Sequence, residues 1–267
     1  YFILTYGQLA SPLIYDGDGA ARQFFASMAL WPTGVQPVLT VGWTLTFELA
    51  FYALFAALLL LPARFRMGAI FLWGLFLMGR LILDQDLPAL PESWLGILIS
   101  PLCLEFVFGA VVAWLIRRMT IPRWLGFGLF YVGAIGFLGL MIAADTLGGL
   151  PDVRSRTISF GVAAAILIAG LVAMERTGRF TPIPGLRAIG DASYTLYLSH
   201  LLVILSLKRI CEALDLMVAP TRLSMIGFMG LALIVSVLAS LILYRILEKP
   251  LLKLSRALLP KTRSETV

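Results

Sequence analysis

The feature that most constrains this chain is the length of its apolar stretches. Residues 223–244 form one stretch of 22 residues without a charged side chain. A helix of about 20 apolar residues spans the hydrocarbon core of a bilayer. Because no water reaches that core, a spanning segment satisfies its backbone hydrogen bonds as a helix or within a closed barrel. Continuous rather than alternating apolar stretches favour helices over barrel strands.

Further stretches of this kind occur along the chain, and the composition agrees with them. The chain is 60% hydrophobic and 13% charged, whereas roughly a quarter of the residues of soluble domains are charged. We therefore predict an all-α, polytopic transmembrane helix bundle, with a partial N-terminal helix from Tyr1 to about Tyr15. About seven complete spans are expected near 38–61, 67–83, 95–116, 124–143, 157–174, 188–207 and 223–244.

The sequence shows no soluble domain and no internal repeat. We predict a single transmembrane domain over residues 1–255 and a basic cytoplasmic tail over 256–267. Tyr1 is not a methionine and falls inside an apolar stretch. We therefore expect the natural protein to begin upstream, with about two further helices before this chain.

Basic residues gather in alternate connections between the spans. These connections and the tail hold 14 of the 21 lysine and arginine residues, while the intervening loops hold nine acids. By the positive-inside rule the basic connections face the cytoplasm. In this assignment Arg154 and Arg156 belong to an outer loop. We expect an integral protein of the bacterial inner membrane, with its C-terminus in the cytoplasm. The net charge of +6 then implies the lipid bilayer as a partner, and no nucleic acid.

Few ionisable residues fall within the expected spans, where each costs about 2.5–3.5 kcal/mol to insert and is a functional candidate. Glu48 and Glu105 are expected mid-span, and His200 slightly beyond the midplane. Each has a structural alternative. Arg80 could extend to the membrane surface, and Glu105 could be a neutral acid between helices or the partner of Arg80. Asp191 could cap a helix, and His200 could form an interhelical hydrogen bond.

Helical spacing strengthens the case for His200. At 100° per residue, Ser193, Tyr197 and His200 fall at about 0°, 40° and −20° on one helix face. A polar stripe on an apolar helix has to face protein or a water-filled cavity.

A second polar stripe recurs every four residues, at Thr44, Glu48 and Tyr52. The two stripes could line one cavity near the midplane. Such a cavity fits a catalytic chamber, a proton-coupled transporter or a polar seam between helices equally well.

Three segments resemble the acyltransferase family 3 membrane proteins. The segment VGWTLTFELAFYALFAALLLLP resembles that family's W-(S/T)-L-x-x-E-x-x-F-Y motif, and IGDASYTLYLSH is similar to its G-x-x-S-Y-x-x-Y-x-x-H motif. ILEKPLLKL is similar to the E-x-P that often closes the last core helix. The resemblance extends from about residue 1 to 255. The matching residues are Trp43, Thr44, Leu45, Glu48, Phe51 and Tyr52, then Gly190, Ser193, Tyr194, Tyr197 and His200, and finally Glu248 and Pro250.

The resemblance implies an integral membrane O-acyltransferase. Such an enzyme takes an acyl group, usually acetyl, from acyl-CoA at the cytoplasmic side. It delivers that group to a hydroxyl of an envelope glycan, a lipid-linked acceptor or a small molecule. Acetyl-CoA would be the donor substrate, and no cofactor would be bound permanently. Two cysteines and one histidine form no metal cluster.

The resemblance also suggests roles for individual residues. The family's upstream arginine–histidine helix, with its expected acyl-transfer base, and its R-x-x-R motif are not in this chain, so we expect the chain alone to be inactive. Arg117, Arg118 and Arg123 could meet CoA phosphates, but the positive-inside rule already explains them. The catalytic candidates are Glu48, His200, Tyr197 and Ser193, and the substrate-binding candidates are Trp43, Thr44, Tyr52, Tyr194, Glu105 and Arg80.

Two other functions remain open from the sequence. A transporter or flippase of envelope precursors would use Glu48, Glu105 and His200 as a proton relay. It predicts discontinuous helices around a midplane site. A non-enzymatic scaffold would leave the polar stripes as contacts between helices.

Overall fold

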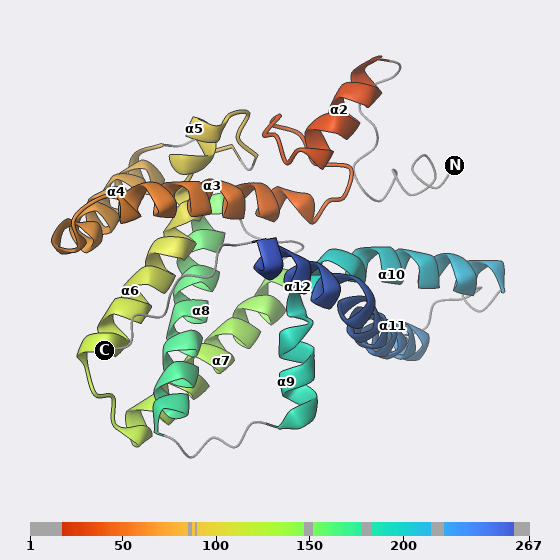
Figure 1. The fold of residues 1–267 in the computed structure, drawn as a ribbon. Coiled ribbons are helices and arrows are strands. Elements are labelled where there is room, and N and C mark those ends of the chain that lie inside the picture. Colours follow the sequence, from red (N-terminus) through yellow and green to blue (C-terminus); the bar gives the residue numbers. More distant parts are fainter. Residues whose placement is uncertain are drawn as a thin grey trace. The chain divides into compact units, whose positions relative to one another are not determined.

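A computed structural model describes residues 18–84, 87–88, 90–146, 152–177, 183–214 and 222–258. These residues form helices and their connections (Figure 1), which confirms the predicted all-α class. The chain divides into two compact units, Tyr1–Thr181 and Pro182–Val267. The expected partial helix from Tyr1 to Tyr15 lies outside the described residues, as do the last residues of the basic tail. The predicted single domain over 1–255 stays a prediction.

The first unit is built around one apolar cluster. Its largest fully buried side chains include Leu77, Leu81, Ile97 and Leu104, each at most 1% exposed. They come from three separate segments, so the cluster fixes these segments against one another. The elements of this unit are α2 (Asp18–Met28), α3 (Gly42–Leu59), α4 (Ala63–Leu83), α5 (Trp94–Leu98), the 3-10 turn η1 (Pro101–Cys103), α6 (Leu104–Arg118), α7 (Arg123–Thr146) and α8 (Val153–Arg176).

Small residues let α7 and α8 pack closely. A Cβ atom added at Gly133 would lie 2.4 Å from the backbone nitrogen of Leu167. One added at Gly170 would lie 2.3 Å from the backbone nitrogen of Phe130. Glycine is therefore required at both places. Close backbone approach through small residues is a common way for helices to associate in lipid, where no hydrophobic effect drives them together.

The second unit contains both of the later sequence motifs. It comprises α9 (Pro184–Asp191), α10 (Ser193–Ala213), α11 (Arg222–Leu243), the π-helical turn η2 (Tyr244–Glu248) and α12 (Lys249–Leu258). Helix α10 packs along α11. Helices α9 and α10 meet at an angle of 75° around Ala192 (Figure 1), so residues 188–207 do not form the straight span that we predicted.

Five helical segments in the described residues are long and apolar enough to cross a membrane, or six if α9 and α10 count as one broken span. The chain is thus a polytopic membrane protein, with fewer spans than the seven expected. Residues 95–116 differ most, because α5, η1 and α6 replace one continuous helix. Pro101 explains the break, since proline lacks an amide donor and disfavours a helical conformation in the residue before it. The qualifying segments are Gly42–Leu59, Ala63–Leu83, Arg123–Ala144, Val153–Arg176 and Ile226–Ala257.

The structure also corrects the expected role of Asp191. The residue before α10 is Ala192, and no side chain caps that helix. Asp191 is instead the last residue of α9. The IGDAS sequence therefore marks the bend between two helices rather than a capped helix start.

Candidate functional site

Helix α3 carries two different faces. Thr46, Phe47 and Ala50 are buried against the apolar cluster and define its inner face. On the other face Glu48 is half-buried and Tyr52 is 59% exposed. The second sequence stripe therefore points away from the core of its own unit.

Glu48 is the ionisable residue of this outer face. Within the part of the chain that the structure describes, its carboxylate has no hydrogen-bond or ion-pair partner. Thr44, one turn earlier, donates its hydroxyl to the backbone oxygen of Val41 over 3.0 Å. The threonine thus has an acceptor in its own helix, while the carboxylate keeps its full hydrogen-bonding capacity.

Trp43 begins the same motif but faces elsewhere. The guanidinium carbon of Arg156 lies 5.1 Å from the centre of the indole ring, within cation–π range. The ring also meets Phe47 edge-on, with centroids 5.8 Å apart. Trp43 is therefore held between α3 and α8. The assignment of Arg156 to an outer loop was wrong, because α8 begins at Val153 and includes it.

The acid at position 105 is near Arg156 too. Glu105 lies in the first turn of α6, directly after the 3-10 turn, and not in the middle of a span. Its side chain passes Gly161 of α8, where an added Cβ would lie 3.5 Å from the Glu105 Cγ. Burial raises the pKa of its carboxyl group, and the positive charge of Arg156 acts in the opposite direction. Arg156 contacts Trp43, but no ion pair joins it to Glu105 within the described residues.

Arg80 pairs with Asp84 rather than with Glu105. Its Nη2 lies 2.5 Å from a carboxylate oxygen of Asp84, and its Nε donates to the same oxygen over 2.7 Å. Its Nη1 donates to the backbone oxygen of Ile99 over 2.8 Å. Arg154 donates to the backbone oxygen of Asp84 over 2.7 Å. Arg80 is therefore held at the end of α4 and is not paired with Glu105. Its extension to the membrane surface stays a prediction.

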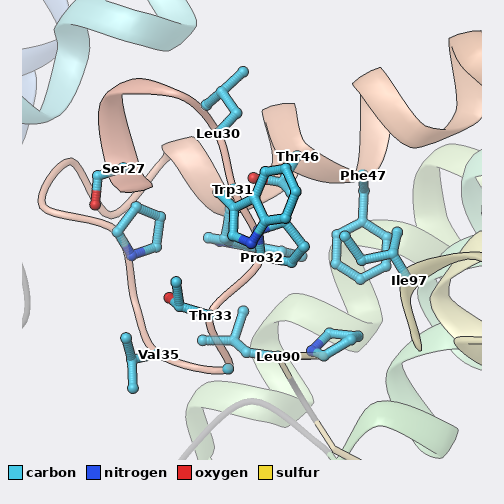
Figure 2. Close-up of a pocket in the computed structure, with 14 residues that line it drawn as sticks. Ser27, Leu30, Trp31, Pro32, Thr33, Val35, Thr46, Phe47, Leu90 and Ile97 are labelled. Atoms are coloured by element: carbon cyan, nitrogen blue, oxygen red, sulfur yellow. The ribbon is translucent and has the colours of Figure 1, made fainter. Parts of the chain in front are cut away.

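A small cavity lies beside Trp43 (Figure 2). Phe47 and Ile97 close one side of it, and the loop residues Thr33 and Val35 lie on the other. Its volume is about 30 Å³, roughly the share of one water molecule in the liquid. It has room for a single small polar group, and a sugar or an acyl chain does not fit in it.

The first sequence stripe forms as predicted on α10. Tyr197 and His200 share a face, with ring centroids 5.8 Å apart. Ser193 begins the helix on the same side and is exposed. Tyr194, one position on, is 51% exposed. The roles of these four residues stay predictions, but the helical register that groups three of them is present.

The hydrogen bonds of His200 indicate its tautomer. Its Nδ1 lies 2.7 Å from the backbone oxygen of Tyr197 and 3.2 Å from that of Leu196. Carbonyl oxygens only accept hydrogen bonds, so Nδ1 carries the proton. In the neutral ring Nε2 is then the free base, and it has no partner within the described residues. The imidazole is thus oriented to accept a proton or a hydrogen bond at Nε2.

Two of the three motif segments meet in the second unit. The hydroxyl of Thr195, inside SYTLYLSH, donates to the Glu248 carboxylate of the E-x-P segment. Glu248 ends the π-helical turn, and Pro250 follows it in α12. Proline cannot donate to the previous helical turn, and a π-turn is one way for a helix to accommodate such an irregularity. The role of Thr195 leaves no signal in the sequence, because its partner is 53 residues away.

The structure therefore joins the sequence candidates in two groups. In the first unit Trp43 and Glu105 both lie against α8, where Arg156 meets Trp43 and Gly161 lies beside Glu105, while Glu48 lies on another face. In the second unit Tyr197 adjoins His200, and Thr195 binds Glu248. The common chamber of Glu48 and His200 stays a prediction.

Comparison with known proteins gives one informative similarity. No family model matches the chain, and no solved structure matches it. The chain is 33% identical over 229 residues to the exopolysaccharide production protein ExoZ of Rhizobium meliloti (strain 1021). The alignment covers 84% of this chain and 65% of that protein, so the chain spans a little under two thirds of its relative. The protein is thus an integral membrane protein related to ExoZ.

Proposed function

We propose that this protein is part of a membrane O-acyltransferase that acts in exopolysaccharide production. It would move an acyl group, in the simplest case acetyl, from acyl-CoA to a hydroxyl of an envelope glycan or its lipid-linked precursor. The name of the relative supports the glycan role. The chemistry is supported by one observation above all: Glu48 and the Nε2 of His200, both within resemblance motifs on membrane helices, keep unused hydrogen-bonding capacity.

The proposed reaction transfers the acyl carbon from sulfur to oxygen. A bond forms between the acceptor hydroxyl oxygen and the thioester carbonyl carbon, and the bond from that carbon to sulfur breaks. The hydroxyl proton passes to a general base, and the CoA thiolate leaves and takes up a proton. A neutral hydroxyl is a poor nucleophile without such a base, which typically contributes 10²–10⁴-fold to the rate.

Four residues of this chain have supporting roles in the proposed reaction. By the resemblance, the principal base is a histidine that is not among the residues of this chain, and Glu48 orients or polarises it or binds the acceptor. Ser193 and Tyr197 offer hydroxyl donors for the substrate or for the developing oxyanion. His200 offers Nε2 as an acceptor that holds the substrate hydroxyl.

Transfer of labelled acetyl groups tests the proposal. The complete reading frame that contains this chain would be expressed, and membranes would be incubated with radiolabelled acetyl-CoA and an envelope glycan fraction. We expect wild-type membranes to label the glycan and Glu48→Gln to reduce labelling about 100-fold, the order of loss when reacting groups are misplaced. Glu212→Gln is the matched control, because that exposed acid pairs with Lys208 and Arg209 of its own helix. Absence of glycan labelling by wild type would contradict the proposal.

A transporter or flippase of envelope precursors is the second candidate, and one observation favours it. The 75° break between α9 and α10 lies directly before the polar stripe, and discontinuous helices commonly build transporter sites. A liposome assay with a fluorescent lipid-linked saccharide distinguishes the two. Wild-type translocation that His200→Ala abolishes, with no acetyl labelling, would favour the transporter.

A further inference from the structure

A larger pocket adjoins the cavity of Figure 2. Its volume is about 510 Å³, within the range of roughly 300–1,000 Å³ that small-molecule sites occupy. It shares Trp31, Pro32, Thr33 and Val35 with the small cavity beside Trp43. Its wall consists of Gly19, Arg22, Gln23 and Ala26 from α2, Trp31, Pro32, Thr33 and Val35 from the following loop, and Glu92 before α5.

The loop that carries Trp31 is held in place at both ends. At the end of α2 the amide of Trp31 donates to the oxygen of Ala26 over 2.8 Å, and Leu30 takes the left-handed φ of 53°. This helix ending normally uses glycine, so Leu30 stores strain beside the pocket. Further along, the amide of Val38 donates to the Ser27 hydroxyl over 3.1 Å. Hydrogen bonds to α2 therefore fix the conformation of this loop.

The loop is also closed against the segment before α5. Gly34 has a φ of 73°, and a Cβ added there would lie 2.5 Å from the Cγ of Glu92. Gln23 is 4% exposed, and its Nε2 donates to the backbone oxygen of Gln36 over 3.1 Å. These contacts form the pocket before any ligand arrives, which lowers the entropy cost of binding.

The pocket combines one aromatic surface with groups that donate and accept hydrogen bonds. The Trp31 side chain is 59% exposed and meets Trp94 edge-on, with centroids 5.9 Å apart. Arg22 and Glu92 both line the pocket, yet neither has an ion-pair partner within the described residues. The Oε1 of Gln23 is buried behind this wall, and among the described residues it has no hydrogen-bond partner.

We propose that this pocket binds a sugar unit of the acceptor glycan, an inference that rests on the proposed function. The C–H face of a pyranose ring packs against an indole ring, while its hydroxyls donate and accept. An arginine donates to such hydroxyls, and a carboxylate accepts from them. The lining carries one positive and one negative side chain, so a polyphosphate or a polycation gains little there. By the positive-inside assignment this pocket is on the outer side, where a growing glycan is accessible.

The residues that the pocket shares with the small cavity bring it near the sequence motif on α3. Trp43 and Trp31 both line the small cavity. A sugar packed on Trp31 would therefore be separated by this cavity from Trp43, the first residue of the α3 motif. A hydroxyl or a water molecule fits the 30 Å³ between them. In this arrangement Trp31 and Arg22 position the acceptor and are not expected to touch the transferred acyl group.

Glycan binding and acceptor kinetics test this inference separately from catalysis. The protein from the complete reading frame would be placed in nanodiscs and titrated with oligosaccharides obtained by partial hydrolysis of the host's own exopolysaccharide. Tryptophan fluorescence and calorimetry would report binding. We expect Trp31→Ala to weaken binding about tenfold or more and Glu92→Gln to weaken it less. Trp124→Ala is the matched control, because Trp124 is 74% exposed on α7 and lines none of these cavities.

The outcomes separate the pocket from the reaction. If wild type transfers acetyl groups but Trp31→Ala changes neither binding nor the acceptor KM, the inference is overturned and the proposed function stands. If no transfer occurs but binding depends on Trp31, the pocket is supported and the function fails. A tenfold rise in acceptor KM with little change in kcat supports both. Binding of glycan-free anionic vesicles that Trp31→Ala abolishes, with no response to oligosaccharide, overturns the sugar assignment.

Discussion

The two motif helices, α3 and α10, place their acidic and basic groups in opposite situations. On α3, Glu48 faces away from the core of its unit and has no partner among the described residues. On α10, the neighbouring Thr195 binds the carboxylate of Glu248, and His200 is anchored through Nδ1 to its own helix. One motif thus leaves a carboxylate unsatisfied, while the other uses a carboxylate as a structural contact.

This difference predicts that Glu48 serves function and that Glu248 serves stability. An unpartnered carboxylate in a membrane helix lowers stability, so it is retained where its chemistry is needed. A carboxylate that accepts from a threonine on the neighbouring helix contributes to packing. Replacing Glu48 is therefore expected to raise the stability of the protein, and replacing Glu248 to lower it. Stability measurements can show this without any substrate.

The largest expected effect concerns Glu48. Replacing it by leucine removes an uncompensated polar group from α3, and we expect a gain of about 1–3 kcal/mol, bounded by the insertion cost of an acid in a membrane helix. The melting temperature of the detergent-solubilised full-length protein measures this. Acyl transfer is expected to disappear in the same variant. A clear fall in melting temperature would show that Glu48 has a structural partner and would remove the contrast with α10.

Glu248 is expected to behave in the opposite way. Glu248→Ala and Thr195→Val each remove the contact between α10 and the π-helical turn, and we expect a loss of about 1.5–3 kcal/mol for a hydrogen bond to a charged group. The double variant should cost little more than either single variant, because the two residues act as one contact. Additive losses would mean that they act independently. Glu212→Gln, on the exposed end of α10, should change stability by less than about 0.5 kcal/mol.

Much of this architecture was predictable from the sequence. The long apolar stretches gave the helical class, and the 100° spacing placed Tyr197 and His200 on one face of α10. The helix breaks were harder to predict. Pro101 carried the signal for the first, but the hydrophobic pattern around it favoured one span. The bend at Ala192 has no proline, and its sequence is also typical of a helix start.

The contacts between helices were not predictable in the same way. Arg156 was assigned to a loop because the expected span began at residue 157, and only the packing of α8 within the first unit brings it to Trp43. Thr195 finds Glu248 across 53 residues. Periodicity describes one helix at a time, so it identifies polar faces but not the faces that they meet.

A smaller effect is expected where α3 is held by α8. Arg156→Gln removes the cation from the Trp43 ring, and we expect a loss of about 0.5–2 kcal/mol, depending on how far the pair is desolvated. Arg156→Lys keeps the charge and should recover part of the loss. A double-mutant cycle with Trp43→Leu isolates the pairwise term. If the cycle gives no coupling, the contact between the Arg156 guanidinium and the Trp43 ring does not contribute to stability.

The smallest expected effect is at the start of the helix that carries Arg156. Asp152 caps α8 by accepting from the amide of Arg154 over 3.2 Å, and a hydrogen bond from the Ser155 side chain is the main cause that lowers its pKa from the usual 3.8. A lowered pKa in the folded state means that folding favours the ionised form. The stability that the carboxylate adds is therefore complete above about pH 5 and is lost as the pH falls through its folded-state pKa. The difference in melting temperature between wild type and Asp152→Asn should follow this course and remain small, since the group is fully exposed. A difference that grows toward acid pH would mean that the cap stabilises α8 in its neutral form.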